Sequence, residues 1–193
     1  MRSKFTAKGF TLVELVVGIV VLAVAMMIMN TMLISQSKDA LEPLYRLRAS
    51  QLGQSIMQNM LSRSYDENSD HNGGLYRCGE GWPIEVVDSA CSTTLGRDGS
   101  ETLKKHQDFN DVDDFITYLG DNGRIAVFIP AVAYGDVLGN LLPDQYTNYS
   151  VKIEVVKIST DVGVVDDRAK KLVVIIKTPS NEEIRFSALK GNY

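Results

Sequence analysis

The sequence predicts an α+β protein in which a long amino-terminal helix packs on an antiparallel β-sheet head. Two observations predict this fold class. An apolar run from Phe10 to Met29, in which Glu14 is the only charged residue, leads into a second helical stripe. The carboxyl third holds short segments in which apolar and polar residues alternate, the pattern of half-buried strands. The residues after the apolar run are numerous enough for one domain with its own core.

The apolar run is long enough to cross a membrane. As a helix with a rise of about 1.5 Å per residue, it spans roughly 30 Å, the thickness of a bilayer core. Residues 1–9 hold Arg2, Lys4 and Lys8 and no acid. Positive charge beside an apolar segment stays on the cytoplasmic side. We therefore predict one membrane span at residues 10–30, with the rest of the chain exported.

Glu14 separates this segment from three simpler interpretations. A cleaved secretory signal has a shorter apolar core of about 7–15 residues, although Ala23-Val24-Ala25 offers a small-residue cleavage site. A plain anchor explains the length but not the carboxylate, which costs about 2.5–3.5 kcal/mol on insertion scales. A buried helix of a soluble protein fits poorly with a basic leader. An ionisable group in a membrane segment indicates a function, so we expect a partner for Glu14.

The helix is predicted to continue to about Ser62. Apolar residues recur every three or four positions, as in an amphipathic helix, at Leu41, Tyr45, Ala49, Leu52, Ile56 and Met60. Residues 31–64 should therefore lie against a globular head formed by residues 65–193. Pro43 removes a backbone donor and clashes with the preceding turn, which predicts either a flexible joint or a fixed bend.

The first half of the head is predicted to be mostly loop. Residues 66–81 and 92–107 are rich in polar residues and glycine. Between and within them we expect a short strand at Ile84–Val87 and a helical turn at Glu101–His106. The turn signal Gly120-Asp121-Asn122-Gly123 then precedes a predicted strand.

Four strands are predicted in the second half, at residues 124–129, 149–157, 172–176 and 184–189. Residues 172–176 are apolar throughout, which indicates a central strand buried on both faces. Thr178–Glu182 should join the last two strands as a hairpin loop. One face of this sheet is expected to pack on the amphipathic half of the helix.

Cys78 and Cys91 are the two cysteines of the chain. Both lie in the part predicted to be exported, where disulfides persist. A bond between them would stabilise the fold by about 3 kcal/mol in the chain-entropy model. A metal site would need more ligands, because the nearest histidine is His71 and there is no Cys-x-x-Cys pair. We therefore expect a disulfide.

The segment Lys8-Gly9-Phe10-Thr11-Leu12-Val13-Glu14-Leu15 resembles the processing site of type IV pilins and type II secretion pseudopilins. The resemblance implies that a prepilin peptidase removes residues 1–9 by cutting after Gly9 and methylates the new amino terminus, Phe10. It implies that Glu14 pairs with the amine of Phe10 in a neighbouring subunit during assembly. A pair within one chain is the alternative, because the two residues lie one helical turn apart.

The same resemblance implies where the protein resides and what it contacts. The subunit would be a single-pass inner-membrane protein with a periplasmic head, and would then enter a surface pilus. Its expected partners are the membrane, the peptidase, other major and minor pilins, and the inner-membrane assembly platform.

The acidic segment Phe109-Asn110-Asp111-Val112-Asp113-Asp114-Phe115, with the cysteine pair before it, is similar to minor pilins of the mannose-sensitive haemagglutinin (MSHA) type IV pilus. This resemblance implies a low-abundance subunit that contributes to pilus assembly and initiation, and thereby to surface attachment and biofilm formation. A secretion pseudopilin and a membrane-anchored periplasmic binding protein are the alternatives.

The aspartates of this segment also suggest calcium. Asp111, Asp113 and Asp114 offer hard oxygen ligands, and some members of the resembled family bind calcium. The glycine and glutamate of an EF-hand loop are absent, however. An acidic solvated loop, or aspartates capping a short helix at Val112–Leu119, is the simpler interpretation. Calcium is thus a weak candidate, and no other cofactor is expected.

Composition and motifs argue against an enzyme and against nucleic-acid binding. The formal net charge is −4, and the leader holds three of the 20 basic residues but none of the 24 acidic ones, so the processed chain lacks a global field for nucleic acid. His71 and His106 fall in predicted loops outside any catalytic motif. Trp82 could stack on a sugar, but a buried core residue is the simpler interpretation. We expect a structural subunit.

Overall fold

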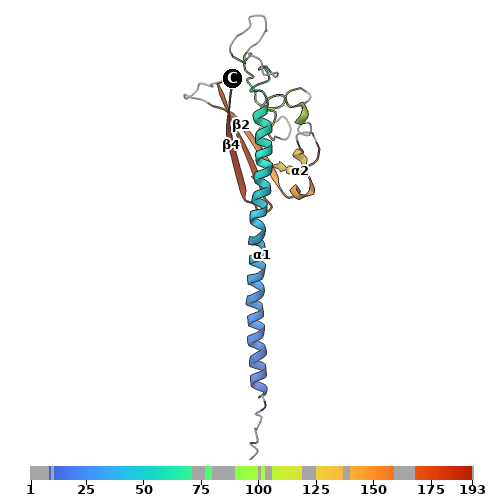
Figure 1. Cartoon of the computed structure of the whole chain (residues 1–193), viewed down its shortest axis with the longest axis vertical. Helices are drawn as coiled ribbons and strands as arrows, with labels where there is room; N and C mark the ends of the chain where they lie inside the picture. The colour runs from blue at the N-terminus through green and yellow to red at the C-terminus, as the bar shows by residue number, and fades with distance from the viewer. Residues whose placement is uncertain are drawn as a thin grey trace, which may run out of the picture. The chain divides into compact units, whose positions relative to one another are not determined.

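The computed structural model describes residues 9, 11–70, 77–79, 90–99, 101–102, 106–118, 125–136, 140–158 and 168–192 (Figure 1). Contacts divide the chain into two compact units, Met1–Leu44 and Tyr45–Tyr193. Helix α1 (Leu12–Ser62) begins in the first unit and ends in the second. The fold is α+β, as predicted.

The first unit contains the apolar part of α1. Its residues from Leu12 to Leu33 are all exposed, because apolar side chains cover every face of the helix and none has a protein surface to pack on. The helix continues through Pro43. The joint and the bend that this proline suggested both stay predictions.

The second unit holds a four-stranded antiparallel sheet in the order β1-β2-β3-β4. The strands are β1 (Ile129–Pro130), β2 (Ser150–Lys157), β3 (Ala169–Lys177) and β4 (Glu183–Gly191). β3 lies between β2 and β4, and its residues from Leu172 to Ile176 are buried on both faces. The prediction of a central apolar strand is confirmed.

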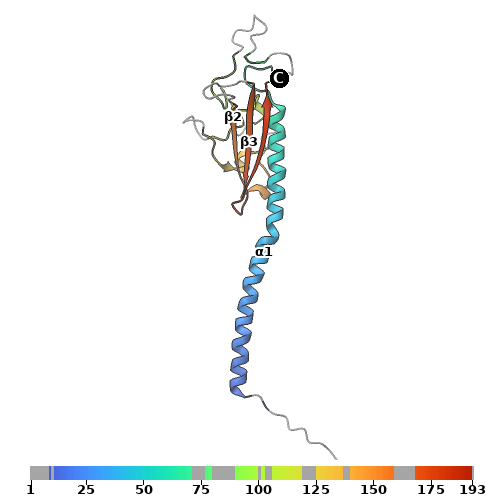
Figure 2. The ribbon, with the colours of Figure 1, turned by 90° about the vertical axis from the view of Figure 1, so that its left-hand side faces the viewer.

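The core of the second unit lies between the sheet and the last five turns of α1 (Figure 2). Ala49, Leu52, Ile56, Met57 and Met60 of the helix share one buried cluster with residues of β2 and β3. The helix approaches β4 closely at Gly53, where an added Cβ would collide with the ring of Phe186. The amphipathic stripe is therefore buried from Ala49 to Met60 as its spacing predicted, whereas its first member, Leu41, is exposed.

The β3–β4 connection is the predicted hairpin. The amide of Thr178 donates to the carbonyl oxygen of Glu182 at 2.8 Å. Asn181 adopts a φ of 66°, a left-handed conformation that asparagine tolerates better than most residues.

Two local predictions were wrong. In the described part of the strand predicted at 124–129, only Ile129 belongs to a strand, β1 (Ile129–Pro130). The Val127 amide donates to the Thr117 carbonyl oxygen at 2.6 Å and not to a neighbouring strand. Residues 112–118 form no helix. Of the turn expected at 101–106, residues 103–105 lie outside the described part of the chain, and a 3₁₀ helix, η1 (His106–Asp108), begins at His106. Two short helices that were not predicted follow prolines, α2 (Ala131–Tyr134) and η2 (Asp144–Tyr146).

Several sequence predictions concern residues outside the described part of the chain. They are the leader, Phe10, His71, Trp82, the strand at Ile84–Val87 and the turn at Gly120–Gly123.

Candidate functional site

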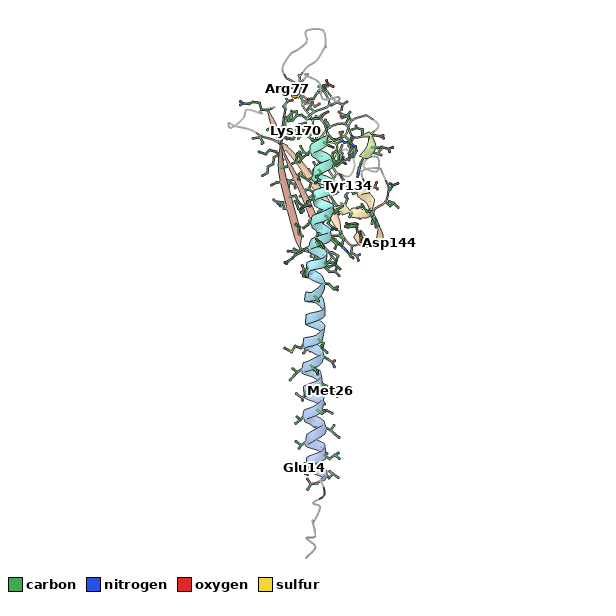
Figure 3. The ribbon with its side chains drawn as sticks, in the orientation of Figure 1. Glu14, Met26, Arg77, Tyr134, Asp144 and Lys170 are labelled. Carbon is green, nitrogen blue, oxygen red and sulfur yellow. A yellow bond between two sulfur atoms is a disulfide. The ribbon has the colours of Figure 1, made fainter. Side chains whose placement is uncertain are left out.

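The amino-terminal end of α1 carries a helix cap at the predicted processing segment (Figure 3). The Glu14 amide donates to the Thr11 hydroxyl oxygen at 3.3 Å, and the Leu15 amide donates to the Thr11 carbonyl oxygen at 3.2 Å. Threonine followed three residues later by glutamate is a known helix-start pattern. Glu14 lies in the first turn, where a negative charge complements the helix dipole. Thr11 therefore fixes where the helix begins, and Glu14 lies within one turn of that point.

The helix after this cap meets the requirements for a membrane span. Within the described residues, one segment is long and apolar enough to cross a membrane, from Leu12 to Leu33. Glu14 lies inside it. Gly9, the residue before the predicted cut, is exposed, and open space surrounds the position that a Cβ would take there. The pairing of Glu14 with the amine of Phe10 stays a prediction.

The two cysteines are joined. The structure bonds Cys78 to Cys91, with their Cα atoms 4.6 Å apart. Both are buried, and the side-chain amide of Asn192 donates to the Cys78 carbonyl oxygen at 2.9 Å. A carboxylate oxygen of Asp66 and the two sulfurs lie within 4.8 Å of one another. Sulfurs bonded to each other are not the thiolates that a metal would need, so this group is no metal site.

A charged network lies inside the head, centred on Lys170 of β3 (Figure 3). The Lys170 side chain is fully buried, and its ammonium group donates to the Tyr65 carbonyl oxygen at 2.7 Å. It also pairs with Asp66, at 3.1 Å, and with Asp113. The three donors of the ammonium group thus meet three acceptors, as a buried charge requires.

The pKa values of this network reflect the ion pairs. Burial alone would lower the pKa of Lys170, but the surrounding carboxylates, Asp113 first, hold that pKa above its usual value. Burial alone would raise the pKa of Asp66. The amide of Ser92 and the charge of Lys170 bring it below its usual value instead. Both groups are therefore charged at neutral pH.

Asp111 and Asp114 lie beside the network and behave differently. Burial, reinforced by repulsion from Asp113 and Asp114, raises the pKa of Asp111 to about 9. Burial and the neighbouring Glu101 raise the pKa of Asp114 to about 8. These two carboxyl groups therefore hold a proton at neutral pH.

The acidic segment is buried, which corrects the expectation of a solvated loop. Asp111, Asp113 and Asp114 are each at most 2% exposed. The side chains of Asp111 and Asp114 bind the backbone of their own segment, which is why no helix forms there, whereas Asp113 accepts from the Gly96 amide and from Lys170. Asp111 accepts the amides of Asp113 and Asp114, and Asp114 accepts those of Asn110 and Asp111, at 2.8–3.3 Å. Calcium binding by these aspartates stays a prediction.

His106, one of the two histidines considered for catalysis, belongs to an aromatic cluster. Its ring centroid lies 4.1 Å from that of Tyr134 and 5.0 Å from that of Phe109. Its Nδ1 lies 3.2 Å from the carbonyl oxygen of Asp136, beside a cavity of about 80 Å³. The residue is 1% exposed, and its ring packs against Phe109 and Tyr134.

Lys170 and Asp66 are network residues that the sequence predictions missed. A signal for Lys170 was present, because side chains two positions apart share a face of a strand. Lys170 therefore lies on the same face of β3 as Leu172 and Val174, which are fully buried. A lysine at a core position needs an acidic partner nearby. The sequence carried no comparable signal for Asp66, which lies in a loop.

Comparison with known families identifies the amino-terminal segment. Residues 4–30 match the family described as the prokaryotic N-terminal methylation motif, which includes the Gly9–Phe10 junction and Glu14. No curated protein and no solved structure matches the chain. The motif implies processing by a prepilin peptidase and assembly with other pilins, and it points to a structural protein. With the apolar helix, it fits a membrane-anchored protein. The matched segment therefore supports a place for this chain in the family of type IV pilins and pseudopilins.

Proposed function

We propose that this chain is a minor pilin of an MSHA-type type IV pilus, comparable to its D subunit (MshD). In that role it contributes to pilus assembly and initiation, and thereby to surface attachment and biofilm formation. The observation that carries the proposal is the methylation motif at residues 4–30, placed on a helix that begins at Leu12 with Glu14 in its first turn. The acidic segment Phe109–Phe115 and the cysteine pair support the MSHA assignment.

The proposed stages of export, processing and assembly follow from the charges of the subunit. The basic leader stays in the cytoplasm while the head reaches the periplasm, where Cys78 and Cys91 are oxidised. Cleavage after Gly9 creates a cationic amine at Phe10, and methylation keeps that charge. The subunit then leaves the bilayer for the filament. Apolar burial changes little in this exchange, so helix packing and the pairing of Glu14 with an amine give it direction.

A type II secretion pseudopilin is the second candidate. The same motif favours it, because the motif specifies processing and membrane insertion but not the filament that the subunit joins. Both candidates require Glu14 for assembly, whereas a membrane-anchored periplasmic binding protein would tolerate its loss.

The test of this requirement is a Glu14→Ala variant. We expect it to insert and to be cleaved normally, but to fall at least tenfold in sheared filaments, because a neighbouring amine then lacks its carboxylate. Immunoblots of membranes and filaments measure both quantities. Glu42→Ala is the matched control, since Glu42 is a glutamate of the same helix outside the apolar segment. Wild-type incorporation of Glu14→Ala would contradict the pairing account.

A further inference from the structure

The Cys78–Cys91 disulfide lies directly against the buried ion network of Lys170. Ser92 follows Cys91 in the chain, and its amide and hydroxyl both donate to Oδ1 of Asp66, at 2.9 and 3.0 Å. Oδ2 of the same carboxylate pairs with Lys170 at 3.1 Å. The carboxylate of Asp66 therefore bridges the cysteine segment and the first residues of the central strand, β3.

Further contacts join residues 90–92, the loop that contains Asp66, and the sheet. The side-chain amide of Asn68 donates to the Ala90 carbonyl oxygen at 2.7 Å, and the Asn68 amide donates to Asp66 at 3.2 Å. Lys157 of β2 donates to the Ser92 carbonyl oxygen at 2.7 Å. Residues 90–92 thus supply donors and an acceptor to the Asp66 loop and an acceptor to the sheet, and the disulfide ties their position to Cys78.

The network depends on this position. Lys170 is fully buried, and a buried ammonium group is tolerated only while its partners are held in place. Asp66 in turn keeps its charge inside the protein because the donors of Ser92 and Asn68 satisfy its other oxygen. If residues 90–92 move away, Asp66 loses two of its donors and the pairing with Lys170 loses its support.

We propose that the Cys78–Cys91 bond is a redox latch that closes the Asp66–Lys170–Asp113 network. In the reduced chain, residues 90–92 leave Asp66 and water reaches Lys170 while the sheet persists. Closure is a thiol–disulfide exchange, in which the two thiols transfer two electrons and two protons to the disulfide of an oxidising protein. Cys78–Cys91 forms, and the oxidant leaves as a dithiol.

Through this bond, the redox state of the compartment would control whether the network is closed. This extension rests on the proposed function because it requires export. In a reducing cytoplasm the charged network stays open, and in an oxidising periplasm it closes. A subunit would then complete its head only after export. Closure of the network is a property of the purified chain and does not depend on pilus assembly.

The experiment compares the full chain in detergent with its Cys78→Ser/Cys91→Ser variant, using acetylation of lysines and peptide mass spectrometry. We expect the labelling rate of Lys170 to rise at least tenfold in the variant. Lys152, a partly exposed lysine of β2, is the control and should change less than twofold. Hydrogen exchange of β2 and β3 amides is measured on the same samples and should stay slow in both. Reducing the folded parent chain with a phosphine repeats the comparison if the variant does not fold.

Two outcomes would overturn the proposal. Equal protection of Lys170 with and without the disulfide would show that the network closes independently of the bond. Loss of protection across β2 and β3 together with Lys170 would show that the disulfide supports the whole head and not this network. Neither outcome bears on pilin assembly, which the Glu14→Ala experiment tests separately.

Discussion

Lys170 is the residue that explains how an acidic segment can lie inside the head. Its ammonium group pairs with Asp66 and Asp113, while Asp111 and Asp114 avoid charge by retaining protons. One cation therefore accompanies four buried carboxyl groups, of which Asp66 is ionised and Asp111 and Asp114 are neutral. Each of these states has a different dependence on pH.

The protonated pair predicts a stability that falls as the pH rises from about 5 to about 8. The folded-state pKa of Asp111, about 9, and that of Asp114, about 8, exceed the ordinary value of 3.8. Across this range the folded head binds more protons than the unfolded chain, so rising pH favours unfolding, with a slope of up to about 1.4 kcal/mol per pH unit per proton. Asp66 has a lowered pKa, and its contribution is lost only at more acidic pH, as its folded-state pKa is crossed.

Asp111→Asn tests this assignment. Asparagine keeps an oxygen for the amides of Asp113 and Asp114 but cannot ionise. We expect a flatter dependence of the free energy of unfolding on pH than in the parent, measured by urea unfolding at pH 5, 6, 7 and 8. Asp108→Asn is the control, because Asp108 is exposed and should leave the slope unchanged. The same slope in Asp111→Asn and the parent would refute the buried, protonated state.

At the scale of elements, helix α1 and strand β4 meet at a glycine. The position of a Cβ on Gly53 collides with the ring of Phe186, and even the ring's Cζ atom lies only 3.0 Å from it. The glycine permits a close approach of helix to sheet, at the cost of a less favourable helix interior. Larger helix side chains near Gly53, such as Leu52 and Ile56, pack in the core between the helix and the sheet.

We expect Gly53→Ala to lower the free energy of unfolding by about 1–2 kcal/mol. Overpacking costs about 1–3 kcal/mol, and the better helix propensity of alanine offsets about 0.5–1 of it. Urea unfolding followed by circular dichroism measures the change. Phe186→Leu should reduce the loss in a double variant. Gly18→Ala, in the same helix but with open space around it, should not destabilise the head. A Gly53→Ala chain as stable as the parent would contradict this packing.

Elements with a regular hydrophobic period could be predicted from the sequence, and elements shaped by side-chain hydrogen bonds could not. The second half of α1 and strands β2 and β4 show their period of 3.6 or 2 directly, and β3 shows a continuous apolar run. The segments around Asp111 and Val127 were predicted as helix and strand because their local composition allows both. Carboxylate–amide bonds decide the structure around Asp111, and the pairing of Val127 with Thr117 decides that around Val127. Neither kind of hydrogen bond leaves a hydrophobic period in the sequence. The processing segment could be predicted because its motif lies within consecutive residues, Lys8–Leu15.

At the scale of the whole molecule, the chain combines two parts with different surroundings. The unit Met1–Leu44 exposes an apolar helix that suits lipid or other helices, and the unit Tyr45–Tyr193 encloses its own core and a disulfide. The methylation motif at residues 4–30 implies that such a chain is processed and then assembled with other subunits.

The most direct test of the proposed minor pilin is quantitative mass spectrometry of filaments sheared from the cell surface. The measurement counts this chain against the dominant pilin and identifies its amino-terminal peptide. We predict a trace amount of the chain, with a peptide that begins at N-methylated Phe10. A dominant share would make it the main structural subunit instead. Its complete absence from filaments, with processed protein retained in the membrane, would contradict the pilin assignment and favour a secretion pseudopilin or an anchored periplasmic protein.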